Sequence, residues 1–268
     1  MTPELFAIFS QLVEEVSGLH YAERDRELFS SKVTVHAEAR GFDALLDFYY
    51  RLRYDDPDGA ETRQLIEALL VHETYFFREL PPLVELIDIC IAPAVAKHGS
   101  ARIWSAACST GEEPFTLAML LDQRGLLDRV EIIATDPSAA SVATARTGRH
   151  SRRSLRGDRA PELSARYLEL GDHGVTVAPR IRDAVKFSTL NLIDDDAHRE
   201  LGIFDAVVCR NVLIYFTDEQ IGRVIARVGT HLASGGLLAV GVSESLLRFG
   251  TTLVCQEHNH AFFYRRAM

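Results

Sequence analysis

The sequence lacks any apolar run long enough to cross a membrane, and its first residues contain no basic segment followed by an apolar core. We therefore expect a cytoplasmic protein with no direct membrane insertion. A basic surplus is lacking too, because the formal net charge at pH 7 is −9. Nucleic-acid binding requires a basic face that neutralises phosphates, so we expect no nucleic-acid partner. The 268 residues suffice for one large domain or two modest ones.

Cysteine is scarce, and its four copies are far apart, with no Cys-x-x-Cys pair. Most lie in apolar runs, so we expect reduced, partly buried thiols rather than disulfides or a metal site. The four are Cys90, Cys108, Cys209 and Cys255. His258 and His260 are two residues apart, but no further ligand is near in the sequence, and we predict no metal site.

The sequence also has no Gly-x-Gly-x-x-Gly motif, yet residues 102–117 have the order of a cofactor-binding loop. A short apolar strand precedes a loop of small residues, 106–111, and Pro114 suits the first turn of a helix. Glu112 and Glu113 at this helix start would repel a phosphate, but they suit hydroxyl or ammonium groups. An ordinary strand-to-helix turn, with acids complementing the helix dipole, is the alternative.

A second apolar run, 131–136, favours the cofactor interpretation. It ends in Asp136, near where nucleotide-binding folds place the carboxylate for the ribose hydroxyls. Residues 234–236 predict a turn. Further apolar strands are predicted at 185–192, 204–211, 237–242 and 261–265. Helices between the strands predict a doubly wound α/β sheet, in which ligands bind beyond the carboxyl ends of the strands. The residues at those ends are Gly111, Asp136, Asn191 and Asn211.

Residues 1–71 predict a small all-helical domain, because apolar residues recur at helical spacing and turn residues separate the helices. The junction that follows, His-Glu-Thr-Tyr-Phe-Phe-Arg-Glu at 72–79, sets polar groups around an aromatic pair. Arg78 beside a cofactor crevice would suit the binding of a carboxylate. The alternative is a helix start capped by Thr74, with the aromatic side chains packed between domains.

A basic segment lies inside this acidic chain, because arginine and lysine outnumber the acids between Arg146 and Lys186. Within it, the alternation of Val175, Val177 and Ile181 predicts short antiparallel strands inserted into the sheet order. Two interpretations stay open for the basic residues: a solvated charged face, or a docking surface for an acidic partner.

Several stretches together resemble the CheR-type methyltransferases. These stretches are 72–79, Trp-Ser-Ala-Ala-Cys-Ser-Thr-Gly-Glu-Glu-Pro at 104–114, Asn-Leu at 191–192, Cys-Arg-Asn-Val-Leu-Ile-Tyr-Phe at 209–216, and Gly-Val-Ser-Glu-Ser at 241–245. The resemblance covers nearly the whole chain. It implies a protein-glutamate O-methyltransferase, which transfers a methyl group from S-adenosylmethionine to glutamate side chains of methyl-accepting chemotaxis receptors in sensory adaptation. The cofactor product would be S-adenosylhomocysteine.

The resemblance also implies the architecture. A class I methyltransferase domain at 72–268, Rossmann-like with a mostly parallel seven-stranded sheet, would follow the helical domain at 1–71. A β-subdomain insert would lie at about 148–184. The helices would face the cytoplasmic domain of the receptor, the insert would hold a receptor C-terminal tail peptide, and the protein would act as a monomer.

By the same resemblance, Arg78 and Tyr215 would be the catalytic residues, with Arg78 orienting the substrate carboxylate. A glutamate carboxylate with an ordinary pKa of about 4.3 is already ionised at neutral pH, so no general base is required. The family commonly has Asn at the position of His72, so cofactor affinity could depend on pH near neutrality. The implied cofactor-binding residues are His72, Thr74, Arg78, Glu112, Asp136, Asn191, Leu192, Asn211 and Val212.

Three rival functions are weighed against this one. An N-methyltransferase on the same fold often carries an Asn/Asp-Pro-Pro-aromatic loop, whereas Asn211-Val212-Leu213 has no proline. A nicotinamide oxidoreductase is disfavoured because the glycine motif is missing and Glu112 and Glu113 would oppose a pyrophosphate. A regulatory module that binds S-adenosylmethionine without turnover would keep the same crevice.

Overall fold

The computed structural model describes residues 1–156, 160–172, 174–195 and 198–267. Contacts divide the chain into two compact units. The first comprises Met1–Val71 with Tyr215–Gln220, and the second comprises His72–Ile214 with Ile221–Met268. No described helix combines the length and apolarity needed to span a bilayer.

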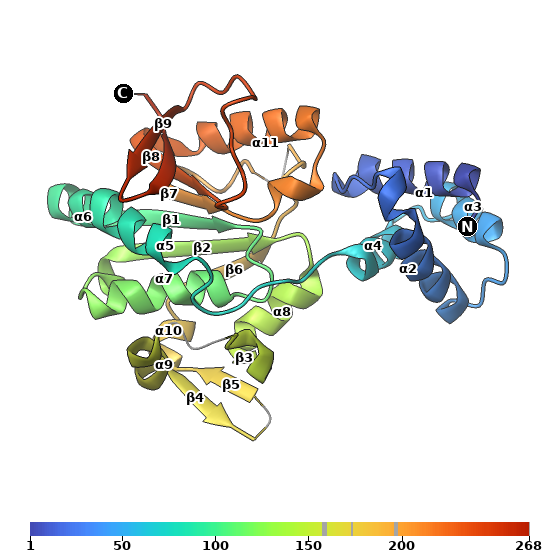
Figure 1. Ribbon diagram of the computed structural model, residues 1–268. Coiled ribbons are helices and arrows are strands. Elements are labelled where there is room, and N and C mark those ends of the chain that lie inside the picture. Colours follow the sequence, from blue (N-terminus) through green and yellow to red (C-terminus); the bar gives the residue numbers. More distant parts are fainter. Residues whose placement is uncertain (157–159, 173, 196–197, 268) are drawn as a thin grey trace. The chain divides into compact units, whose positions relative to one another are not determined.

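The first unit is helical (Figure 1). Its first helix begins where the Thr2 side chain accepts a hydrogen bond from the Leu5 N–H, and it ends at Gly18, which adopts a left-handed conformation (φ 81°). Phe9, Phe29 and Phe48 are fully buried in the core of the unit. The helices are α1 (Pro3–Ser17), α2 (Arg26–Ala39), α3 (Leu45–Tyr54) and α4 (Ala60–Leu69).

The second unit is built on a seven-stranded sheet with the order β6-β2-β1-β7-β8-β10-β9. The strands from β6 to β8 are parallel, whereas β10 runs antiparallel to both β8 and β9. The bounds are β1 (Ala101–Ala106), β2 (Val130–Asp136), β6 (Val185–Thr189), β7 (Phe204–Cys209), β8 (Leu232–Val240), β9 (Val254–His258) and β10 (Ala261–Arg265). The predicted doubly wound, mostly parallel sheet is confirmed.

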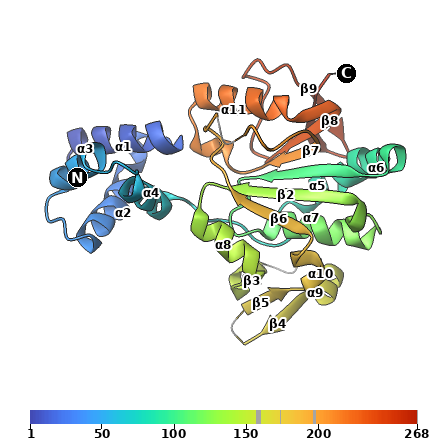
Figure 2. The same ribbon diagram turned by 180° about the vertical axis from the view of Figure 1, so that it is seen from behind.

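Helices cover both faces of this sheet. Ile103, Ile132 and Val208 project from one face into a core shared with the helix after β1. In Figures 1 and 2, α7 and α11 lie on opposite sides of the sheet. The helices of the unit are α5 (Leu80–Leu86), α6 (Ala92–His98), α7 (Glu112–Gln123), α8 (Ala139–Thr147), α9 (Pro161–Tyr167) and α10 (Pro179–Arg182), and α11 (Asp218–Thr230) begins at the boundary with the first unit.

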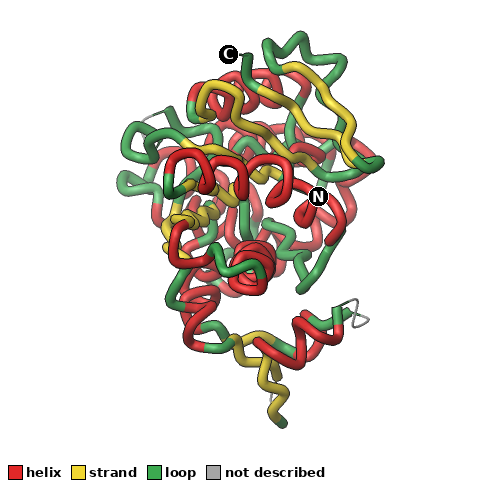
Figure 3. Tube along the Cα trace, turned by 90° about the vertical axis from the view of Figure 1, so that its left-hand side faces the viewer, coloured by secondary structure: helices red, strands yellow, loops and turns green. Residues whose placement is uncertain are grey.

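The inserted β sheet is a separate three-stranded antiparallel sheet (Figures 1 and 3). Its order is β3 (Arg149–His150), β5 (Gly174–Val177), β4 (Leu168–Gly171). Gly174 (φ 152°) lies so close to the partner strand that an added Cβ would be 2.1 Å from the His150 carbonyl oxygen, so the pairing requires glycine there. The antiparallel insert predicted from the sequence is confirmed.

The turn predicted at 234–236 is wrong, because these residues lie inside β8. The register between β7 and β8 shifts between the pairs Phe204–Leu232 and Ala206–Leu237, so the two glycines fill an irregularity instead of ending the strand. The expectation of unpaired thiols is confirmed. Burial raises the pKa of Cys90 to about 11 and that of Cys108 well above its ordinary value, so neither thiol is an activated nucleophile.

Candidate functional site

The loop after β1 is fastened to the end of β2. The Cys108 N–H donates to the Thr135 carbonyl oxygen (2.9 Å), and the Ser109 N–H donates to Asp136 Oδ2 (2.7 Å). Asp136 is buried, and its Oδ1 also accepts a hydrogen bond from the Ser138 N–H (3.0 Å). The backbone of Ser109 is left-handed (φ 50°). The Asp136 carboxylate is thus fixed at the carboxyl end of the sheet.

Gly111 begins α7 with φ 96°, and an added Cβ would lie 2.9 Å from the Cβ of Ala145 and 3.1 Å from the ring of Phe187. Only glycine allows the loop to pass this close to α8 and β6. Gly111 of the predicted small-residue loop therefore serves tight internal packing.

Glu112 is the most enclosed acid of the site, with its side chain 2% exposed. Its Oε2 accepts a hydrogen bond from the Thr110 hydroxyl (2.7 Å), and its Oε1 accepts one from the Ser154 hydroxyl (2.8 Å). His150 Nδ1 lies 3.3 Å from the same Oε1. Burial alone raises the pKa of Glu112, but hydrogen bonds from His150, Thr110 and Ser154 outweigh it and hold the pKa below its ordinary value. Glu112 is therefore a carboxylate held in one orientation.

Two of these partners come from the insert, and sequence reasoning missed both. The ring of His150 is enclosed by the edges of Phe76 and Phe115, at centroid distances of 5.0 and 5.8 Å. The Ser154 carbonyl oxygen accepts a hydrogen bond from the Phe76 N–H (2.8 Å). The start of the insert is thus part of the wall around Glu112. A single histidine between basic residues gives no sequence signal for such a role.

The segment 72–79 is not a helix start, because α5 begins only at Leu80. The alternative interpretation of Thr74 as a helix cap is therefore wrong. The Phe77 N–H is held by the Thr116 hydroxyl of α7 (3.2 Å), and exposed His72 meets the Ser141 hydroxyl of α8 (2.9 Å) through Nδ1.

Arg78 stands between two residues with left-handed backbones, Phe77 (φ 63°) and Glu79 (φ 47°). Such conformations cost on the order of 1–3 kcal/mol each in a non-glycine residue, and they persist only where the surroundings impose them. The Arg78 Nη1 donates to the Glu73 carbonyl oxygen (2.7 Å), which is the one hydrogen bond of this guanidinium within the described chain. Its other N–H groups are available to a ligand.

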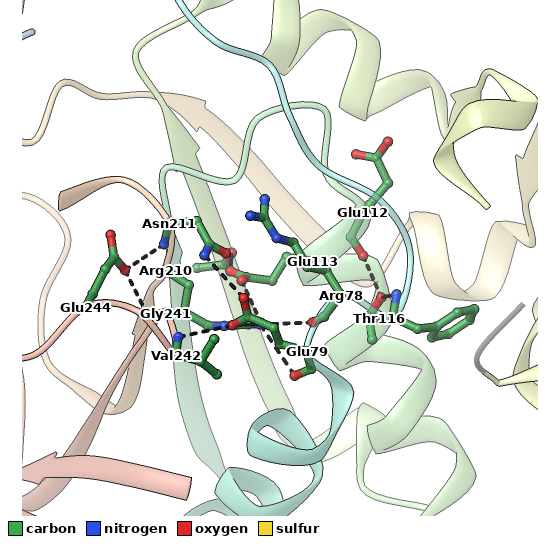
Figure 4. A network of polar contacts seen from close by, with 12 residues as sticks. Arg78, Glu79, Glu112, Glu113, Thr116, Arg210, Asn211, Gly241, Val242 and Glu244 are labelled. Atoms are coloured by element: carbon green, nitrogen blue, oxygen red, sulfur yellow. Dashed lines mark hydrogen bonds and ion pairs between the residues drawn. The ribbon is translucent and has the colours of Figure 1, made fainter. Parts of the chain in front are cut away.

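A polar network joins Arg78 to the ends of β7 and β8 (Figure 4). Arg210 follows β7 and contacts Glu79 and Glu113, with Nη–O distances of 2.8 and 3.1 Å. Burial raises the pKa of Glu79, but Arg210 and Asn211 outweigh this effect and lower it. Burial raises the pKa of Glu113 above its ordinary value even though Arg210 opposes the shift. Sequence reasoning assigned no role to Arg210.

The remaining predicted site residues have different settings. Asn191 follows β6, and its Oδ1 accepts a hydrogen bond from the Ile193 N–H (3.2 Å). Leu192 is buried, and Val212 is half-buried beyond β7. Tyr215 belongs to the helical unit, where it packs against the core and its carbonyl oxygen accepts a hydrogen bond from the His20 N–H (2.8 Å). Arg78, Glu112, Asp136 and Asn211 all lie in the sheet unit.

The donors and acceptors of the sheet unit suit one kind of cofactor. Buried acids at the ends of β1 and β2, Glu112 and Asp136, match a ligand that carries an ammonium group and ribose hydroxyls. The Ser109 hydroxyl is buried without a hydrogen-bond partner in the described parts of the chain, as expected where a ligand supplies the partner. The residues present therefore fit S-adenosylmethionine. Fold and site together define a class I methyltransferase that depends on this cofactor.

Comparisons with known proteins assign the family. The family model described as CheR methyltransferase, SAM binding domain, matches residues 72–261. Chemotaxis protein methyltransferase 1 of Pseudomonas aeruginosa is 32% identical over 250 residues, which is 90% of each chain. Chemotaxis protein methyltransferase Cher2 of Pseudomonas putida is also 32% identical, over 90% of each chain. A chemotaxis protein methyltransferase of Vibrio parahaemolyticus is 33% identical over 89% of this chain and 88% of its own.

The chain belongs to the CheR methyltransferase family. The family resemblance, the methyltransferase activity and the S-adenosylmethionine cofactor predicted from the sequence are thereby confirmed.

Proposed function

We propose that this methyltransferase acts on glutamate side chains in the cytoplasmic domain of chemotaxis receptors and converts their carboxylates to methyl esters. The observation that carries the proposal is the fixed presentation of Arg78, whose guanidinium retains donors for a carboxylate. The names of the relatives, which are chemotaxis protein methyltransferases, support a receptor as the substrate.

When bound, the cofactor supplies an electrophilic methyl group on a sulfonium. The substrate carboxylate is ionised at neutral pH, so the chain needs no general base. Its task is to bring the carboxylate oxygen into line with the methyl group, and such positioning lowers the barrier by on the order of 7 kcal/mol at best. Arg78 orients the carboxylate, and the Tyr215 hydroxyl makes a second contact.

In this proposal the residues predicted from the sequence bind the cofactor. Asp136 binds the ribose hydroxyls, and Glu112 faces the amino-acid part. Their fixed carboxylates support both roles. Thr74 and Arg78 line the methionine end together with His72. Asn191 and Leu192 frame the adenine, while Asn211 and Val212 lie at the sulfonium end.

Residues 1–71 and the insert at about 148–184 are assigned to receptor binding. The helices face the receptor, and exposed apolar side chains there, such as Leu28, Val35 and Tyr54, support a protein contact. The insert holds a receptor tail peptide. In this proposal residues 72–268 are the catalytic domain, and the protein acts as a cytoplasmic monomer.

Arg78→Ala tests the proposal. We expect the rate at which a receptor cytoplasmic fragment is methylated to fall by at least about 100-fold, because the substrate carboxylate loses its orientation. Mass spectrometry of the fragment's peptides measures this rate. Thermal melting should stay close to that of the wild type, since Arg78 is not a core residue.

Arg129→Ala is the matched control, because this exposed arginine precedes β2 at the opposite end of the strand. It should methylate at the wild-type rate. Turnover near wild type in Arg78→Ala would contradict the role given to Arg78.

A further inference from the structure

We propose that Arg210 is a positioning residue for methyl transfer. Its buried guanidinium holds the backbone of Arg78 in place. The inference rests on the proposed function of Arg78 and extends it to a residue that cannot reach the substrate. The Arg210 side chain is 1% exposed, so its contacts are with the protein alone.

The backbone on both sides of Arg78 is strained. A residue flanked on both sides by left-handed, non-glycine neighbours has no intrinsic preference for its position, so other contacts must impose it. Phe77 is held by Thr116 on one side of Arg78. On the other side, the contacts of Glu79 must supply the constraint.

The Arg210 guanidinium contacts both the backbone of Arg78 and the acids around it (Figure 4). Its Nη2 donates to the carbonyl oxygen of Arg78 itself (2.9 Å) and to Glu79 Oε2 (2.8 Å). Its Nη1 donates to Glu113 Oε2 (3.1 Å), and Glu113 is fixed in turn by the Ser105 hydroxyl of β1 (2.7 Å). One planar cation therefore ties the Arg78 backbone to β1, β7 and α7.

Glu79 is also anchored by residues that follow β7 and β8. Its carboxylate accepts hydrogen bonds from the Asn211 side chain (3.3 Å) and from the Val242 N–H (3.3 Å). Asn211 follows β7 and Val242 follows β8. The segment that contains Arg78 is thus fixed in position relative to β7 and β8, at the carboxyl ends of the strands.

Arg210 does more than form an ion pair. The Nε–H of Arg210 is buried without a partner in the described residues, whereas both terminal nitrogens bond to acceptors on two different segments. A planar fork can span these acceptors, but the single ammonium of lysine cannot. Movement of the Arg78 guanidinium by about 1 Å would cost on the order of 100-fold in turnover.

Arg210→Lys and Glu79→Gln test the inference with the full chain and a receptor fragment. We expect Arg210→Lys to lower kcat by roughly 100-fold and Glu79→Gln to lower it by roughly 10-fold. The Kd for S-adenosylmethionine, measured by calorimetry, should rise no further than it does in Arg78→Ala, because Arg210 and Glu79 affect the cofactor only through Arg78. Each change is also combined with Arg78→Ala, and the rate of methyl transfer is measured in single turnovers with labelled cofactor. Neither change should lower this rate below that of Arg78→Ala alone, because Arg210 acts through Arg78.

Arg265→Lys is the matched control. Arg265 is the last residue of β10, which lies between β8 and β9, and it bridges Gln256 and the Gly235 carbonyl oxygen. Within the described chain it contacts none of the residues around Arg78, so its replacement should leave kcat unchanged. Wild-type kcat in both Arg210→Lys and Glu79→Gln, or losses that multiply with that of Arg78→Ala, would overturn the inference.

The outcomes also separate this inference from the proposed function. An inactive Arg78→Ala with active Arg210→Lys and Glu79→Gln contradicts the positioning role alone. An active Arg78→Ala contradicts both. Lysine keeps the positive charge but cannot bond to both buried acids and the Arg78 carbonyl oxygen at once, so Arg210→Lys can fail to fold. In that case Glu79→Gln and its combination with Arg78→Ala decide the question.

Discussion

Glu112 accepts hydrogen bonds from two hydroxyl groups and contacts one imidazole while it stays almost out of solvent. A carboxylate enclosed in this way interacts strongly with a cation that enters the same site. We predict that Glu112→Gln raises the Kd for S-adenosylmethionine by about 10-fold or more, because the amide removes the charge that faces the ammonium group. Calorimetry with the free cofactor measures this directly.

Glu131→Gln is the control for that change. Glu131 lies near the start of β2, away from the carboxyl ends, and pairs with Arg102 and Lys186. Its replacement should leave cofactor affinity unchanged. Equal affinities in Glu112→Gln and the wild type would refute the assignment of Glu112.

Buried His198 should make the free energy of unfolding depend on pH. Its ring is buried against Trp104 and His231, at centroid distances of 5.7 and 5.6 Å. Burial, followed by the neighbouring His231, lowers the pKa of His198 below its ordinary value, and Asp194 opposes the shift. Above a pH of about 6.5 the imidazole is neutral in both the folded and unfolded states. As the pH falls below that value, the unfolded chain binds the proton more readily, so stability decreases.

His198→Phe should therefore flatten the dependence of unfolding free energy on pH between about 7 and 5. Urea unfolding at several pH values is the measurement. A variant that loses stability with acid as steeply as the wild type does would show that another group causes the loss.

At the scale of elements, the turn after β7 depends on one side chain from beyond β8. Glu244 accepts hydrogen bonds from the backbone N–H groups of Asn211 (2.7 Å), Leu213 (2.8 Å) and Gly241 (2.8 Å). Asn211 is left-handed there (φ 58°), so the turn that presents it needs this anchor.

We predict that Glu244→Gln lowers the free energy of unfolding by about 1–3 kcal/mol, because an amide cannot accept from all of these donors. The melting temperature should fall by several degrees. Ser243→Ala is the control, since Ser243 is exposed. A melting temperature unchanged by Glu244→Gln would contradict the anchoring role.

Elements were predictable from sequence where local patterns dominate. Apolar runs predicted the parallel strands, and the small-residue loop with Pro114 predicted the start of α7. The turn at 234–236 failed because two glycines predict chain reversal. Instead they form an irregularity within β8, where Gly235 is left-handed (φ 78°) and the backbone of Gly235 and Gly236 hydrogen-bonds to Arg266. Strand β9 was missed because its side chains are mostly half-exposed and show no apolar alternation.

At the scale of the whole molecule, long-range contacts limited the prediction. The acids at the strand ends could be found because sheet topology brings such positions together. Arg210 and Glu79 are 131 positions apart, and Ser154 is 42 positions from Glu112. No local pattern encodes these pairs.

The segment Tyr215–Gln220 shows the same limit in the fold. It follows β7 in the sequence but packs with the helices of the first unit. Sequence reasoning placed Tyr215 near the reacting centre through family resemblance, and that role stays a prediction.

The central claim is that the product is a glutamate methyl ester on a chemotaxis receptor. We would incubate the protein with methyl-labelled S-adenosylmethionine and a receptor cytoplasmic fragment, and then treat the labelled fragment with mild alkali. The account predicts release of the label as volatile methanol, because a carboxyl ester is hydrolysed under these conditions. Label that stays on the fragment, as an N-methyl group would, or no incorporation despite cofactor binding, would contradict it.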